Sequence, residues 1–142
     1  MTDLIVLAGE LAKEIEWQTI PEDMSVDDLT PMLVKAIKEF YIMAGKADQY
    51  DDSMVVYDET VPIAFTATFK LDEQEYILAA AKVFFFEKVQ TTVNNIVSYS
   101  TDAMSRTNAD KPYKNLQDTI ALLRARKIEI WHKMTRYNMV CL

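Results

Sequence analysis

The sequence of 142 residues predicts a mainly α-helical protein with one small β-hairpin. Two segments, 72–97 and 112–139, are long, rich in helix-forming residues and free of glycine. Residues 54–70 instead carry β-branched and aromatic side chains in alternation with small or polar ones. A chain of this length is normally one domain. We therefore expect a single domain over 1–142, with two long antiparallel helices, two shorter helices and the hairpin.

The first short helix is expected over residues 3–17. Leu4, Leu7, Leu11 and Ile15 are three or four positions apart, so they share one face of a helix. This apolar face should pack on the rest of the protein, because the positions between these residues are largely polar or small.

The second short helix is expected to begin at Thr30 and Pro31. A threonine oxygen can accept hydrogen bonds from free amides at a helix start, and proline is tolerated in the first turn. Leu29 would contact Val34 across this start, and Gly45 provides the expected end. The expected buried face consists of Met32, Leu33, Ala36, Ile37, Phe40 and Tyr41.

The hairpin is expected to join residues 54–57 to residues 63–70. Residues 58–62, DETVP, have the composition of a turn, and Pro62 suits the first position of a strand. The alternation places three apolar side chains on one face of the second strand: Phe65, Ala67 and Phe69.

The two long helices should lie antiparallel, because they are of similar length and follow each other in the chain. Asp72 and Glu75 have the spacing of a capping box, and Asp110 is a candidate N-cap for the last helix. The last helix has heptad-like apolar spacing that Lys127 interrupts. The apolar positions are Leu116, Ile120, Leu123, Ile130, Met134 and Tyr137.

The connection between the long helices, 98–112, reads SYSTDAMSRTNADKP. Its short polar side chains can bond to nearby backbone, which favours an ordered loop. Tyr99, Met104 and Arg106 could then contact a neighbouring protein. Alternatively, residues 97–101 extend into a short strand, or the whole segment is a solvated connector.

Phe84, Phe85 and Phe86 are consecutive, so on a helix they cover more than half of the circumference. Either the rest of the domain covers all three, or one of them faces a neighbouring subunit. Trp131, which has basic neighbours, is a similar interface candidate because aromatic residues and arginine dominate interface energies.

Charge is distributed unevenly along the chain. Residues 111–142 contain seven basic and two acidic side chains and so have a net charge of +5. The other 110 residues have a net charge of −12, which gives the total of −7. Basic residues of the last helix, among them Arg124, Arg126 and Lys127, could attract the acidic part of a neighbouring copy. They could equally neutralise acidic residues of their own subunit.

The sequence contains no recognisable catalytic or metal-binding motif. His132 is the only histidine, Cys141 is the only cysteine, and two glycines cannot form a glycine-rich phosphate loop. We therefore expect no enzymatic activity and no cofactor. No apolar run is long enough to cross a membrane, and the first residues lack the basic start of a signal peptide, so an intracellular, membrane-free protein is expected.

Several segments resemble the head–tail connector, or adaptor, proteins of tailed bacteriophages. The similarity covers roughly residues 28–137 and is carried by AIKEFY at 36–41, LDEQEYI at 71–77, KVQ at 88–90 and the segment 100–112. It implies a non-catalytic virion protein of the neck, assembled in the host cytoplasm. Such a protein forms a ring of copies beneath the portal protein, contacts other neck or tail proteins, and lets DNA pass without sequence-specific binding.

Two other functions are compatible with the residues. A helical adaptor or regulator without a virion role could hold a partner helix against the region of Phe84 to Phe86. A nucleic-acid-binding protein could use the basic last helix, but the overall acidity of the chain disfavours capture of DNA.

Overall fold

The computed structural model describes residues 1–15, 26–100 and 107–140, with the side chains of 1–15, 27–90 and 117–136. It confirms the predicted fold class. The α-helices are α1 (Leu4–Glu14), α2 (Val26–Met43), α3 (Leu71–Ser100) and α4 (Thr107–Val140), and the strands are β1 (Thr2–Asp3), β2 (Val55–Asp58) and β3 (Val61–Phe65). Two short 3₁₀ turns, η2 (Ala47–Gln49) and η3 (Asp52–Met54), precede β2.

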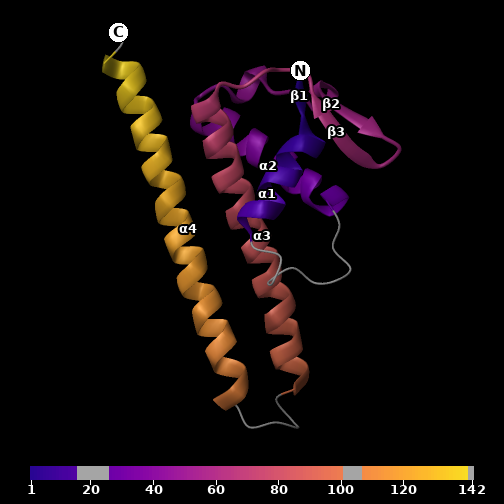
Figure 1. Ribbon diagram of the computed structural model, residues 1–142, viewed down its shortest axis with the longest axis vertical. Helices are drawn as coiled ribbons and strands as arrows, with labels where there is room; N and C mark the ends of the chain where they lie inside the picture. Colours follow the sequence, from indigo (N-terminus) through magenta and orange to yellow (C-terminus); the bar gives the residue numbers. More distant parts are fainter. Residues whose placement is uncertain (16–25, 101–106, 141–142) are drawn as a thin grey trace.

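Helices α3 and α4 run antiparallel along the whole length of the molecule, as predicted (Figure 1). The shorter elements form a body around the first half of α3, and α4 lies along the opposite side of α3. The second half of α3 and the first half of α4 extend beyond this body as a two-helix projection.

The sheet has three antiparallel strands in the order β1-β3-β2. The predicted hairpin is confirmed over 55–65, but β3 begins one residue before Pro62 and ends at Phe65 instead of continuing to residue 70. Beyond Phe65 the chain is fixed by other bonds: the Thr2 hydroxyl donates to the Ala67 carbonyl at 2.7 Å, and the N-terminal amine donates to the Thr68 hydroxyl at 2.9 Å.

The predicted start of α2 at Thr30 is wrong, because the helix already begins at Val26. Asp27 and Asp28 occupy its first turn, where carboxylates are favourable near the free amides. Pro31 cannot donate to the Asp27 carbonyl four residues earlier, and the Thr30 hydroxyl donates to that carbonyl instead, at 3.0 Å. Thr30 therefore replaces a hydrogen bond inside the helix.

The predicted end of α2 at Gly45 is confirmed. Gly45 has a φ of 70°, and the amides of Gly45 and Lys46 donate to the carbonyls of Ile42 and Tyr41. These two bonds form a Schellman motif, which needs a residue with positive φ and therefore favours glycine.

The starts of the two long helices differ from the prediction. Helix α3 is capped by Glu73, whose carboxylate accepts from the Lys70 amide at 2.8 Å, so the pair Asp72 and Glu75 does not form the capping box. Asp110 lies inside α4 and is not its N-cap. Because α3 continues to Ser100, residues 97–100 are helical and do not form the alternative strand. Of the polar connection 98–112, residues 98–100 belong to α3 and residues 107–112 to α4.

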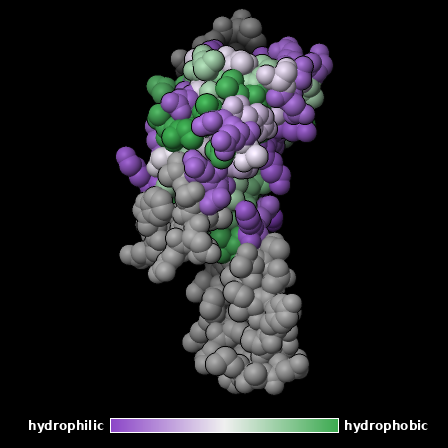
Figure 2. All heavy atoms as spheres, turned by 90° about the vertical axis from the view of Figure 1, so that its right-hand side faces the viewer, coloured by the Kyte–Doolittle hydropathy of each residue, from purple (hydrophilic) through white to green (hydrophobic). Residues whose placement is uncertain are grey.

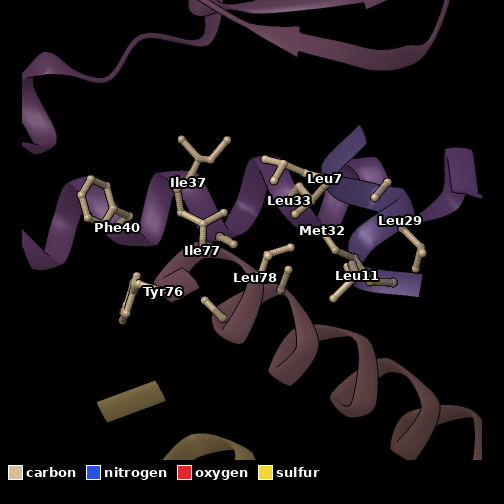
Figure 3. Packing of buried hydrophobic residues seen from close by; sticks show 14 of the residues in the cluster. Leu7, Leu11, Leu29, Met32, Leu33, Ile37, Phe40, Tyr76, Ile77 and Leu78 are labelled. Carbon is tan, nitrogen blue, oxygen red and sulfur yellow. The ribbon is translucent and has the colours of Figure 1, made fainter. Parts of the chain in front are cut away.

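One hydrophobic core lies between α1, α2, α3 and the sheet. The predicted apolar faces of α1 and α2 are buried, including Leu4, Leu11, Leu33 and Ile37 at 3% exposure or less. Figure 3 shows side chains of α2 pointing toward Tyr76, Ile77 and Leu78 of α3. Helix α4 adds Ile120, Ile130 and Met134 from the other side of α3.

Candidate interaction surfaces

The three consecutive phenylalanines of α3 separate into two environments. Phe85 and Phe86 are buried at 0% and 7% exposure, with their rings edge to face and 5.3 Å apart. They belong to the core of their own chain, which corrects their assignment to a contact with a neighbouring subunit. Phe84 remains partly exposed, and the Lys35 ammonium lies 4.5 Å from the centre of its ring.

Phe84 lies in an open hollow of about 640 Å³ between α2, β3 and α3. Pro31 and Pro62 contribute apolar walls, whereas Asp27 and Lys35 contribute charges of opposite sign. The hollow could accept a small apolar side chain of a partner, but its charges do not favour one sign of ligand.

Trp131 packs against its own chain. Its ring lies 5.2 Å from Tyr76 of α3 and 6.3 Å from Phe40 of α2, and it is only partly exposed. Its indole therefore helps to attach α4 to the body, and only the remaining exposed part is free to meet a neighbour.

The three basic residues expected to attract a neighbouring copy are paired within the chain. Arg124 contacts Glu87 of α3 at 2.8 Å, and Lys127 contacts Glu39 of α2 at 2.9 Å. Arg126 lies within 4 Å of two carboxylates, those of Glu75 and Glu129. Neutralisation inside one subunit, the alternative left open by the charge pattern, thus occurs for these residues, and their role between copies stays a prediction.

Two buried polar atoms lie at or near the Glu39–Lys127 pair. Within the described part of the chain, the second oxygen of Glu39 and the hydroxyl of Tyr76 are both buried without a hydrogen-bond partner. Burial, and then the nearby carboxylate of Glu39, raise the pKa of Tyr76 to about 12. The phenol is therefore neutral at physiological pH.

Sequence reasoning missed the surface that α4 turns away from α3. Leu122 and Ile128 are 72% and 51% exposed, and the exposed Ala121 and Ala125 lie between them on the helix surface. A second apolar stripe could have been recognised from the sequence, because Ala121, Ala125 and Ile128 follow one another at spacings of four and three residues. Glu129 and Arg136 continue this outer face. Lys133 lies at its edge, where it also lines a groove with Asp72 and Glu75 of α3.

The free end of the hairpin is a second surface that sequence reasoning missed. Tyr57 is 54% exposed, and Asp58 and Glu59 are exposed next to it. Glu59 has a φ of 56°, which turns the chain from β2 into β3. Figure 2 faces the side that carries the hairpin and shows many hydrophilic residues around smaller hydrophobic areas.

The connection expected to dock on a neighbour, residues 98–112, is described over its helical parts, 98–100 and 107–112. Met104 and Arg106 lie outside the described residues, and of Tyr99 only the helical backbone is described. His132 is exposed on α4. Among the described side chains, no group of three or more His, Cys, Asp and Glu residues could hold a metal ion.

Comparison with known proteins identified no relative: no family model, curated protein or solved structure matches the chain. A search of the described helices found none that is long and apolar enough to span a membrane.

Proposed function

We propose that the chain is a structural protein of a phage virion, which forms a ring of copies at the neck. In this role it joins the portal protein to other neck or tail proteins and lets DNA pass through the ring. It would be made in the host cytoplasm, act without a cofactor or membrane, and catalyse no reaction. The resemblance of several sequence segments to head–tail connector proteins supports this proposal.

The main structural support for this proposed function is the exposed outer face of α4. A helix of 34 residues at 1.5 Å each is roughly 50 Å long, and its outward side is accessible along the described part. Leu122 and Ile128 are two of the large apolar side chains that the described part of the chain leaves exposed. Apolar groups concentrated on one helix face are stabilised when another protein covers them.

Charge supports a passive role toward DNA. The net charge of −7 gives the chain an overall repulsion for phosphate groups, so DNA could move past it without being held. Arg124, Arg126 and Lys127 on the basic helix are paired with carboxylates of the same chain, which reduces their attraction for DNA.

The second candidate function is a helical adaptor that binds another protein without a virion role. The hollow around Phe84 favours it, because a partly exposed aromatic ring between α2, β3 and α3 can accept an apolar side chain. An adaptor of this kind would bind its partner as a monomer or dimer and would not need a ring.

Localisation within particles tests the proposed function. Virions purified from cells that produce this chain should carry it, and gold-labelled antibody should mark the junction of head and tail. Electron microscopy of particles made without the chain should show heads and tails that fail to join. If the chain is abundant in the cells but missing from purified particles, the virion role is wrong. Loss of a non-virion partner in a Phe84→Asp variant would then favour the adaptor.

A further inference from the structure

The hairpin tip and the outer α4 face have complementary chemistry. The hairpin tip consists of Tyr57, Asp58 and Glu59, which present an aromatic ring and two carboxylates. The outer α4 face presents apolar and mainly basic groups together, namely Leu122, Ala125, Ile128, Lys133 and Arg136, with Glu129 as an acidic residue among them. Association of such surfaces would bury apolar groups and bring opposite charges together.

The charges at both surfaces are available for a partner. Within the described part of the chain, Asp58, Glu59 and Arg136 form no ion pair, and Lys133 contacts only Glu129 on its own helix, at 3.5 Å. The Lys133 side chain is 70% exposed in that contact. An exposed pair of this kind contributes little to stability, so Lys133 can exchange its partner readily.

The two surfaces lie on opposite sides of the molecule. In Figure 1, the hairpin of β2 and β3 projects at the right edge, and α4 forms the left edge. One copy therefore cannot join its own two surfaces, whereas the hairpin tip of one copy can reach the outer α4 face of the next. Pairing either surface with itself would bring like charges together.

We propose that the outer α4 face binds the hairpin tip of a second copy of this chain. The contact joins two different patches, so it leaves one free patch of each kind and repeats from copy to copy. Repetition closes into a ring when the rotation between copies allows it. This inference rests on the proposed function, since it names the surfaces through which the ring would form.

Charge reversal on each surface tests the contact. Variant A carries Lys133→Glu and Arg136→Glu, and variant B carries Asp58→Lys and Glu59→Lys. The matched control for A, Lys13→Glu with Lys46→Glu, makes the same charge change at exposed positions on α1 and after α2. Association is measured by sedimentation velocity, and helix content by circular dichroism confirms that each variant folds.

We expect wild type and the control to associate, whereas A and B alone should associate at least about tenfold more weakly, because each brings like charges together. An equal mixture of A and B should regain association, because the acidic α4 face of A matches the basic hairpin tip of B and the two unchanged surfaces also match. Added salt should weaken the wild-type contact. Leu122→Gln with Ile128→Gln should weaken it without changing its salt dependence.

Three results would overturn the inference: a wild type that stays monomeric, variants A and B that associate like wild type, or a mixture that does not recover. The virion role is judged separately, by the presence of the chain at the neck of particles. Normal neck labelling together with unchanged association of A and B would mean that the ring uses other surfaces. Recovery in the mixture together with particles that lack the chain would leave the self-contact in place and refute the virion role.

Discussion

The Glu39–Lys127 pair should anchor α4 to the body, and replacing Lys127 by methionine tests this. The Lys127 ammonium lies 2.9 Å from a Glu39 oxygen, and the two side chains are only 17% and 26% exposed. At an effective dielectric constant of about 20, this separation corresponds to about 6 kcal/mol of attraction, most of which desolvation offsets. Lys127→Met keeps most of the side-chain volume but leaves the Glu39 carboxylate without its cation. We expect the free energy of unfolding to fall by about 2–3 kcal/mol.

Urea unfolding of four proteins measures the interaction: wild type, Lys127→Met, Glu39→Gln and the double variant. The double variant should lose less stability than the sum of the two single variants, with a coupling of about 1–2 kcal/mol. Lys133→Met is the matched control, because Lys133 pairs with Glu129 at the surface, at 3.5 Å and with 70% exposure. It should cost no more than about 0.5 kcal/mol.

The reasoning fails if Lys127→Met is as stable as Lys133→Met, or if the two single effects add without coupling. Either result would mean that packing of apolar side chains such as Met134 holds α4 in place without help from the ion pair.

Four further variants test the packing and hydrogen bonding of the body by urea unfolding. The pKa of Tyr76 is raised to about 12 in the folded protein. The stability that this group contributes should therefore be constant below pH 10 and fall by on the order of 2–3 kcal/mol between pH 10 and 12. Tyr76→Phe should reduce that fall, and an unchanged pH profile of the variant would contradict the raised pKa. Thr30→Val removes the donor to the Asp27 carbonyl and should cost about 1 kcal/mol; a neutral effect would show that this carbonyl has another partner. Phe85→Ala should cost about 3–5 kcal/mol and Phe84→Ala about 1–2, since only Phe85 is fully buried; equal losses would contradict their different environments.

Most of the helical framework could be predicted from local patterns. The stripe of Leu4, Leu7 and Leu11 identified α1, and the buried face and glycine end of α2 were correct. The helix starts were less predictable, because a residue that can cap a helix can also lie inside one. Threonine is a residue type that often caps helices, yet the Thr30 hydroxyl donates to the Asp27 carbonyl, which Pro31 leaves without a donor.

The candidate surfaces were predicted less well than the fold. Phe84, Phe85 and Phe86 are chemically identical, and only the positions of α2, α4 and the sheet decide that two are buried and one is accessible. Sequence reasoning selected the basic residues of α4 by charge alone. The structure pairs Arg124 and Lys127 with carboxylates from other helices and leaves Arg136 on the outer face.

The sequence by itself determined the elements that a local pattern of neighbouring residues specifies: the helical stripes, the presence of a hairpin and the long uninterrupted helices. The expected alternation of Phe65, Ala67 and Phe69 was wrong, because β3 ends at Phe65. Tertiary structure alone decided what depends on residues far apart in the chain. Thr2 and Asp3 become a strand only because Phe65 and Ala64 lie beside them. Lys127 interrupts an apolar stripe in the sequence, but Glu39, 88 residues away, makes it an anchor. Side-chain spacing specifies which face of an element is apolar, whereas the partner of a charge depends on how the elements pack.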